Sequence, residues 1–508
     1  MLLSSREKTR RRYALRAPRS RRVGSATLRR DQVSEGRDSV KGTLIALAIV
    51  CLALAASAAG ATAAIRVGKV VDVTQDQTSQ NETPLAVNPV NASNMITGNN
   101  DWNYNDGCGV NTTTDGGKTW TPSLPNGFLP GVTKYTNDPN VAGDGSYDAG
   151  GDPTIAFSPD GKIAYFVCQA FNFTSPFQIA LLLNRSYDGG LTWQHTGLVT
   201  VSAFNGNGQT KGSNGKFADH ENIHVDPTNG NVYVTWAEFS GIQGSKSPVY
   251  VAVSRDNGDT FTVNKVTNGN VRSNQDQRVV TDENGNAYLV FDNGVQGGKG
   301  TVLYVAKSTD GGATWGTPVQ FAALDNPVCV FPPTCFNISG GQFRAGGTYP
   351  APAYDSVHHH LVVAVPDIRA GGIGQIYIYA LNPDLSTAFT TMVPAGFGDR
   401  FENELTAAPN GRLDLSFYDR SYSGNALVDL TYAESSDGGQ TWTQARVTPI
   451  GFDPSTWGVP SSSATGYRPF IGDYNGQVST NDWAGITWTG FASPQPFNLE
   501  TDFAKVTP

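Results

Sequence analysis

The chain has 508 residues, a mass of 54.0 kDa and a formal net charge of −8 at pH 7. Apolar residues make up 39% and charged residues 16%, which excludes a highly charged disordered chain. The 57 glycines and the 10% aromatic content suit many short strands joined by tight turns. Basic residues are concentrated in residues 1–42, so the rest of the chain is net acidic and we expect no nucleic-acid partner.

Residues 1–64 are predicted to be a basic leader followed by a targeting segment. An uncharged, largely aliphatic stretch runs from Thr43 to Ala64, and it ends in small residues such as Ala59-Gly60-Ala61. A basic flank, an apolar stretch and an A-x-A site are typical of an export signal peptide. The alternative is a signal-anchor, in which residues 43–64 stay in the membrane as one helix. We therefore predict a secreted or extracytoplasmic protein, with a membrane-anchored form as the alternative.

Export makes the cysteines outside the leader candidates for disulfide bonds. Cys329 and Cys335 flank a short loop that one disulfide would close. Cys108 and Cys168 would then be the second pair. A zinc site is the weaker alternative, because the sequence has no C-x-x-C motif.

One short motif of the form S/T-x-D-x-G-x-T-W/F recurs five times after residue 65. Its first copy is Thr113–Trp120 and its last is Ser435–Trp442. An Asp carboxylate accepts hydrogen bonds from nearby backbone N–H groups and glycine adopts positive φ, so the motif is predicted to be a turn between two strands. The five aspartates are therefore structural candidates: Asp115, Asp188, Asp256, Asp310 and Asp437.

Two apolar strands precede each motif, as in Ile223–Val225 and Val232–Trp236. Each period then holds four short strands, which predicts the blade of an all-β fold, the β-propeller. A degenerate copy of the motif at Asn382–Phe389 fills the long gap between the fourth and fifth copies. Six units therefore end in the motif or its remnant.

A seventh unit is predicted after the last motif, from strands at Phe470–Ile471, Ala484–Trp488 and Thr501–Val506. The segment Ile65–Val73 would supply its fourth strand and close the ring. Seven blades are favoured and six are the alternative, in a single domain of residues 65–508.

The repeated motif is similar to the Asp box, or BNR repeat, of the sialidase superfamily, and the resemblance covers roughly residues 80–490. The stretches Asn88–Asn94, Gly151–Thr154 and Tyr467–Gly476 also resemble bacterial secreted BNR-repeat proteins. The resemblance implies a β-propeller, and an exo-glycosidase acting on sialic acid or another acidic sugar. Sialidases hold the substrate carboxylate with three arginines and use a tyrosine nucleophile, a glutamate and an aspartate acid/base. The chain lacks the Arg-Ile-Pro stretch of these enzymes, since Arg66 is followed by Val-Gly.

If the motif turns lie at one face of the propeller, first strands begin and second strands end at the opposite face, which we call the top face. The candidates there for a carboxylate clamp are Arg278, Arg369, Arg400, Arg420 and Arg468. The candidate catalytic residues are Tyr349, Tyr418, Glu402, Glu404 and Asp152. Further top-face carboxyls are Glu82, Asp219, Glu221, Asp276 and Asp473. The alternative role for each Asp/Arg pair is to tie neighbouring blades together.

No cofactor is expected, although Asp144–Asp152 is an oxygen-rich stretch of the kind that binds Ca²⁺, with a solvated loop as the alternative. We expect a glycan or another extracellular ligand as the partner, and a monomer. The alternative function is a non-catalytic surface propeller that binds glycans or proteins. A polysaccharide lyase on the same scaffold is a third hypothesis.

Overall fold

The computed structural model describes residues 64–508 except 76–77, 103–106, 123–127, 137, 139, 174–176, 206–215, 241–245, 295–300, 325–342, 370, 457, 461–466 and 492–497. The predicted leader and the predicted pair Cys329 and Cys335 lie outside the described residues. The described part of the chain contains no helix with the length and hydropathy needed to span a membrane.

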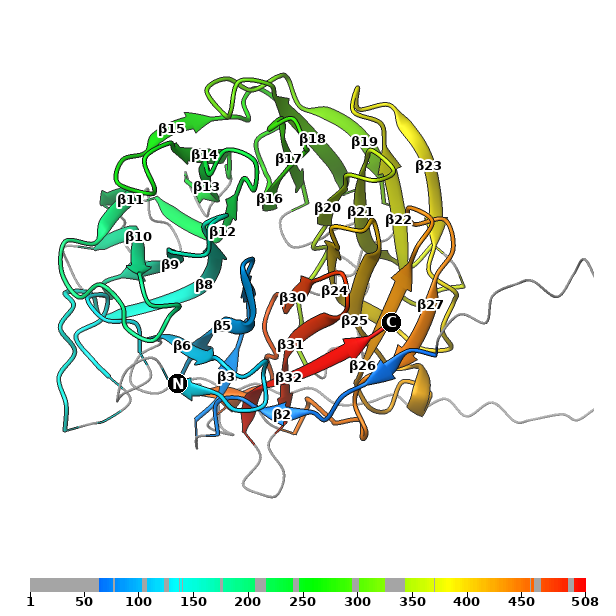
Figure 1. Ribbon diagram of the computed structural model, residues 1–508, viewed down its shortest axis with the longest axis horizontal. Coiled ribbons are helices and arrows are strands. Elements are labelled where there is room, and N and C mark those ends of the chain that lie inside the picture. Colours follow the sequence, from blue (N-terminus) through cyan, green and yellow to red (C-terminus); the bar gives the residue numbers. More distant parts are fainter. Residues whose placement is uncertain are drawn as a thin grey trace, which may run out of the picture. The chain divides into compact units, whose positions relative to one another are not determined.

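Seven antiparallel sheets surround one axis, with first strands beside the axis and last strands at the rim (Figure 1). Blade 1 comprises β3 (Gln80–Asn81), β4 (Leu85–Asn88), β5 (Asn91–Asp101), β6 (Gly107–Thr113) and β7 (Thr121–Pro122). Blade 2 comprises β8 (Ala149–Phe157), β9 (Ala164–Phe171), β10 (Gln178–Ser186) and β11 (Val199–Asn205). Blade 3 comprises β12 (Phe217–Val225), β13 (Val232–Phe239), β14 (Val249–Ser254) and β15 (Thr262–Lys265).

The other blades repeat this order. Blade 4 comprises β16 (Gln275–Thr281), β17 (Ala287–Asp292), β18 (Val302–Ser308) and β19 (Val319–Ala323). Blade 5 comprises β20 (Ala351–Asp355), β21 (His360–Asp367), β22 (Gln375–Leu381) and β23 (Thr387–Met392). Blade 6 comprises β24 (Arg400–Ala407), β25 (Leu413–Asp419), β26 (Asp429–Ser435) and β27 (Thr443–Arg446). Blade 7 comprises β30 (Gly476–Ser479), β31 (Ala484–Phe491), β32 (Leu499–Thr507), β1 (Arg66–Val67) and β2 (Val71–Asp72). A short pair, β28 (Val459–Pro460) and β29 (Tyr467–Arg468), and one 3₁₀ turn (Ser421–Ser423) lie outside the blades.

The N-terminal segment closes the ring, as predicted. Strand β32 pairs with β31 on one side and with β1 and β2 on the other, in the register Val71↔Phe503 and Asp72↔Asp502. The prediction that Phe470–Ile471 is a strand of this blade is wrong, because β30 is its innermost strand. The backbone N–H of Ile471 donates instead to the carbonyl of Arg344, at 3.1 Å, outside the blade.

The burial of the strands follows from the stacking of the blades. Middle strands such as β9 are buried along almost their whole length, because each lies between two neighbouring sheets. The rim strand β15 is exposed and carries polar residues. The predicted disulfide between Cys108 and Cys168 is present and links β6 of blade 1 to β9 of blade 2.

The repeated motif forms the turn after the third strand of its blade. In the first copy, Oδ1 of Asp115 accepts hydrogen bonds from the N–H groups of Lys118 and Thr119, each at 3.0 Å. The Thr119 hydroxyl donates to Oδ2 at 2.7 Å, and these hydrogen bonds lower the pKa of Asp115 to about 2. The Asp188, Asp256, Asp310 and Asp437 carboxylates make equivalent bonds. Each of these aspartates thus accepts hydrogen bonds within its own turn.

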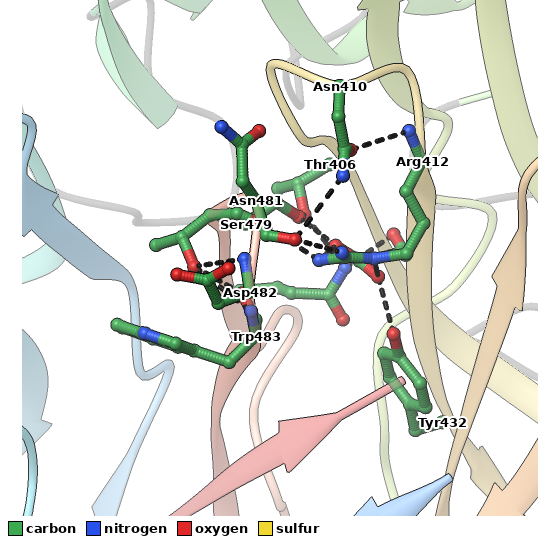
Figure 2. Close-up of polar contacts among 11 residues, drawn as sticks. Thr406, Asn410, Arg412, Tyr432, Ser479, Asn481, Asp482 and Trp483 are labelled. Carbon is green, nitrogen blue, oxygen red and sulfur yellow. Dashed lines mark hydrogen bonds and ion pairs between the residues drawn. The ribbon is translucent and has the colours of Figure 1, made fainter. Parts of the chain in front are cut away.

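A buried polar network connects blade 6 to blade 7, the blade that the N-terminal strands complete (Figure 2). The Arg412 guanidinium donates to both oxygens of Asp414, at 2.7 and 2.9 Å, and to the Thr480 carbonyl at 2.8 Å. Asp414 also accepts from the hydroxyls of Tyr432 and Ser479. Because Asp414 is fully buried, this network supplies the partners that its charge needs.

Replacing Gly117 by Ala should destabilise the protein by about 2–4 kcal/mol, because its φ is 86° and a Cβ atom would lie 2.1 Å from the Phe503 ring. Gly116→Ala is the matched control, since its φ is 79° but no atom lies within 4 Å of its Cβ position. Gly116→Ala should lower the free energy of unfolding by only about 1 kcal/mol. Thermal and denaturant unfolding would measure both, and equal losses would contradict the packing explanation.

Arg412→Met should destabilise the protein by about 3–5 kcal/mol, because it leaves the buried Asp414 carboxylate without its bidentate partner. Lys162→Met removes an exposed pair with Asp160 and should leave the melting temperature unchanged. If both variants have the melting temperature of the wild type, the network in Figure 2 does not stabilise the contact between blades 6 and 7.

Candidate functional site

The register of the strands puts the top face opposite the motif turns, as expected from the sequence. In blade 6, Arg400 of β24 pairs with Asp419 of β25, which pairs with Asp429 of β26. At the other end, Ala407 and Leu413 pair beside Ser435, where the motif turn begins. First strands therefore start at the top face, beside the axis.

A β-bulge recurs at the start of the first strand. Register shifts interrupt the first strands of blades 2, 3, 4 and 6, and in blade 1 the first strand is divided into β3 and β4. Each interruption holds a residue with φ between 49° and 58°: Glu82, Asp152, His220, Asp276 and Glu402. A bulge of this kind re-aims a side chain, and positive φ in polar residues is frequent at functional sites. Each of these residues also stands three positions before an apolar strand residue.

Buried polar contacts join these positions across the axis. Nδ1 of His220 lies 2.6 Å from Oδ1 of Asp276, and Nε2 lies 3.3 Å from Oδ2 of Asp473. The Arg344 guanidinium donates to the same Asp473 oxygen at 2.5 Å. His220, which is 3% exposed, therefore joins blades 3 and 4 to the segment that precedes β30 of blade 7.

One segment, Phe343–Gly346, holds two carboxyl groups of the top face. Besides the Arg344 contact with Asp473, the N–H of Gly346 donates to Oε2 of Glu402 at 2.9 Å. A Cβ atom on Gly346 would lie 2.2 Å from the Asp473 carbonyl oxygen, so the close approach requires glycine. Glu402 of blade 6 and Asp473, which precedes β30, thus bond to the same segment, one through a backbone N–H and the other through a guanidinium group.

The pKa values of Glu402 and Asp473 are shifted in opposite directions. It raises the pKa of Glu402 well above the ordinary value, and the Asp473 charge adds to this effect. Burial also opposes ionisation of Asp473, but the charge of Arg344 and the hydrogen bond with His220 outweigh it and lower the pKa of Asp473. Glu402 therefore favours its protonated form more than an ordinary glutamate does, and Asp473 favours its ionised form.

His220 is surrounded by acidic groups. Its burial opposes the charged imidazolium, but Asp219 and the contacts with Asp276 and Asp473 outweigh burial and raise its pKa well above the ordinary value. Burial raises the pKa of Asp219 to about 7. The same cause raises the pKa of Glu82, Glu221 and Asp276. The protonation of each group at the centre of the top face thus depends on the charges of its neighbours.

A cavity of about 290 Å³ follows the axis beside this cluster. Tyr349 and Tyr474 line it and stack with their ring centroids 5.9 Å apart, and both rings also contact His220. Nη1 of Arg278 donates to both oxygens of Glu404, at 2.6 Å each, across the cavity wall. The Arg278 guanidinium also lies over the Tyr349 ring, 4.4 Å from its centroid.

The arginines predicted to clamp a substrate have separate protein partners. Arg369 pairs with Asp367 and donates to the Tyr379 hydroxyl, Arg400 pairs with Asp419, and Arg420 donates to the Asn425 carbonyl. Arg278 pairs with Glu404 and so connects blades 4 and 6, whereas the alternative considered from the sequence was a pair between neighbouring blades. Arg468 is exposed, and its guanidinium lies 5.4 Å from the centroid of the Phe470 ring.

The two candidate tyrosines are buried phenols. The Tyr418 hydroxyl donates to the Thr489 carbonyl at 2.7 Å, and burial raises the pKa of Tyr418 well above the ordinary value. Burial raises the pKa of Tyr349 to about 12. Both side chains are neutral at pH 7, so a role as nucleophile remains a prediction that needs an activating base.

The sequence analysis missed His220 and Arg344. The signal for His220 was its position three residues before an apolar strand, which it shares with Asp152 and Glu402. For Arg344 the sequence offered no repeat signal.

The carboxylates of the oxygen-rich stretch Asp144–Asp152 have different partners. Asp144 accepts from the N–H of Gly131 and contacts His195, and Asp148 pairs with Lys134. Asp152 lies beside His220.

No family model matches the chain, and no curated protein matches it. Among solved structures, the chain is similar to the intramolecular trans-sialidase of Ruminococcus gnavus, at 15% identity and a TM-score of 0.44, covering 72% of this chain and 97% of that one. It is also similar to an α-L-arabinofuranosidase of Fusarium graminearum, at 14% identity and a TM-score of 0.42, covering 69% and 91%. A protein of unknown function from Dyadobacter fermentans matches at 14% identity and a TM-score of 0.45, covering 71% and 96%. The protein is thus a seven-bladed β-propeller with buried acidic groups at its axis.

His224 provides a pH-dependent test of the cavity wall. Its Nε2 lies 2.9 Å from the Thr281 hydroxyl, and burial lowers its pKa to about 4, against the opposing effect of Asp226. As the pH falls from 6.5 to 4, the unfolded chain binds this proton first, so stability present above pH 6.5 is lost.

Replacing His224 by Gln should therefore reduce the loss of melting temperature between pH 7.5 and pH 5. His359→Gln, at an exposed histidine, is the control and should behave as the wild type. Equal pH dependence in all three proteins would contradict the assignment of a neutral His224.

Proposed function

We propose that the protein is an exported glycoside hydrolase whose catalytic carboxyl groups are Glu402 and Asp473 at the top face. The observation that carries the proposal is that the segment Phe343–Gly346 holds both groups, one through a backbone N–H and the other through Arg344. The predicted leader and the disulfide between Cys108 and Cys168 support export.

Glycosidases use two carboxyl groups with different charge states. The Glu402 carboxyl would donate its proton to the glycosidic oxygen as the bond from that oxygen to the anomeric carbon breaks. The Asp473 carboxylate, with Arg344 as its counter-charge, would stabilise the developing positive charge on the sugar ring. It would then add to the anomeric carbon or activate the water that does so.

An acidic sugar is the substrate class that the surrounding cations favour. The guanidinium carbons of Arg344 and Arg468 lie 3.8 and 5.4 Å from the centroid of the same ring, that of Phe470. Two guanidinium groups beside one aromatic ring suit a substrate carboxylate, as in sialic acid or a uronic acid. Arg468 is one of the clamp residues predicted from the sequence, and Arg344 would act beside it.

A non-catalytic glycan-binding propeller is the second candidate. It is favoured by the separate partners of Arg278, Arg369, Arg400 and Arg420, which leave no three-arginine clamp among these four. The same top face would then bind a glycan without cleaving it. In either case the proposed partner is a glycan and the proposed form is a monomer.

The test is hydrolysis of fluorogenic sialosides, glucuronides and arabinofuranosides by the purified protein. We expect turnover of an acidic sugar, with kcat lowered about 100-fold or more in Glu402→Gln and in Asp473→Asn. An activated dinitrophenyl leaving group should rescue Glu402→Gln but not Asp473→Asn, because only the first step needs the acid. Arg468→Gln should raise KM for acidic substrates alone.

Asp292→Asn is the matched control, because it changes a fully buried carboxyl at the end of a second strand. It should keep its kcat if it folds. The absence of turnover for every substrate, together with retained binding on a glycan array, would replace the hydrolase with the binding propeller.

A further inference from the structure

His220 is held in place through its backbone as well as through its ring. It stands at the bulge of β12 with a φ of 52°, and its N–H lies 3.3 Å from Oδ2 of Asp152 in blade 2. Its carbonyl accepts a hydrogen bond from the Gln277 amide of blade 4. The imidazole is therefore fixed among blades 2, 3 and 4.

Both nitrogens of this imidazole face carboxyl groups. Nδ1 lies 2.6 Å from Oδ1 of Asp276, and Nε2 lies 3.3 Å from Oδ2 of Asp473. A neutral imidazole has one N–H, so only an imidazolium can donate to both carboxylates. The Tyr349 ring, with its centroid 5.6 Å from that of the imidazole, lies at a distance at which an aromatic ring attracts a cation. The geometry thus suits a charged His220.

The acidic groups that act on His220 come from blades 1 to 4 and from the segment that precedes β30. They are Glu82, Asp152, Asp219, Asp276, Asp292 and Asp473. Burial opposes the charged ring, but Asp219, Asp276 and Asp473 outweigh burial and raise the pKa of His220 well above its ordinary value. The rings of Tyr349 and Tyr474 also contact the imidazole, and burial raises the pKa of both phenols. The charge on His220 thus offsets part of the surrounding negative charge.

Asp473 receives two donors on one oxygen. Nη2 of Arg344 and Nε2 of His220 both contact Oδ2, at 2.5 and 3.3 Å. The Arg344 side chain is 22% exposed, whereas that of His220 is 4% exposed. The more exposed guanidinium can also reach a substrate carboxylate, while the buried imidazole is confined to its protein partners.

We propose that His220 is a positioning residue for Asp473: an imidazolium, anchored by Asp276, that orients the Asp473 carboxylate and supplies it with a counter-charge. This inference rests on the proposed role of Asp473 in glycoside hydrolysis. In that role Arg344 is shared with the substrate carboxylate, and His220 keeps a positive charge on Asp473. Asp276 of blade 4 then acts on the reaction through His220, without itself contacting the substrate.

The first measurement is the pH profile of kcat/KM for His220→Gln, whose amide keeps a hydrogen-bond donor but carries no charge. Loss of the positive charge raises the pKa of Asp473, so the acid limb of the profile should move to higher pH by about one unit. We also expect kcat to fall about 10-fold or more. A dinitrophenyl leaving group should not rescue this loss, because the defect acts through Asp473 and not through Glu402.

Asp276→Asn should shift the acid limb in the same direction, because it removes the anchor of the imidazolium. His358→Gln is the matched control. It removes another contact between a histidine and an aspartate, that of Nδ1 with Oδ2 of Asp355 at 2.7 Å, after the first strand of blade 5. This control should keep the wild-type profile.

The second measurement needs no turnover. Nitrogen-15 spectra of protein labelled in its histidine rings distinguish an imidazolium from a neutral ring. We expect the His220 ring to keep both N–H protons at pH 8 in the wild type, and to lose one of them at lower pH in Asp276→Asn.

A neutral His220 ring at pH 7, or an unchanged acid limb in folded His220→Gln, would overturn the positioning role and leave the hydrolase proposal standing. If the wild type turns over no substrate, the hydrolase proposal fails and the positioning role fails with it. If His220→Gln does not fold, the acid limb of Asp276→Asn and the ring spectra decide.

Discussion

The pairing of the N-terminal strands with β32 is the constraint on which the rest of the structure depends. It joins the two ends of the described chain through the register Val71↔Phe503, so that seven sheets form a closed ring. Only closure brings first strands from all seven blades to one axis. Contacts such as that between His220 and Asp473, which are distant in the sequence, follow from it. The network around Arg412 and Asp414 secures the same blade from its other side (Figure 2).

The second constraint is the bulge at the start of the first strands. Positive φ at polar residues is unfavourable, and the fold repeats it in five blades. The result is a set of carboxyl groups and one imidazole directed to a common buried region, where water no longer screens their charges. Their pKa values then depend on individual partners: Arg344 lowers the pKa of Asp473, while burial raises the pKa of Glu402.

Much of the fold could be predicted from the sequence because its signals are local. The motif around Asp115 specifies a turn through its own side chain, and the apolar strand pairs before each motif specify the blade. Closure by Ile65–Val73 and the disulfide of Cys108 could also be predicted, from counting strands and cysteines. The innermost strand of blade 7 was misplaced, because Phe470 and Ile471 are buried by contacts with Arg344 that no local pattern reveals.

The site was less predictable for a related reason. Residue type and position along a strand identified Glu402, Asp473 and Asp152 as top-face groups, but not which of them share a partner. The partners of Arg278 and Arg400 depend on the packing of blades, and Arg344 enters from a connection between blades. His220 was overlooked because the other blades have acidic residues at the equivalent position, so their pattern does not predict a histidine there.

The most direct test of the account is a crystal structure of the protein soaked with 2,3-didehydro-2-deoxy-N-acetylneuraminic acid, an acidic sugar whose ring is flattened at its double bond. We predict that its ring lies between the carboxyl groups of Glu402 and Asp473, with its carboxylate beside Arg344 and Arg468. A sugar bound only at the rim or at the face of the motif turns would contradict the assignment of the functional site to the top of the axis.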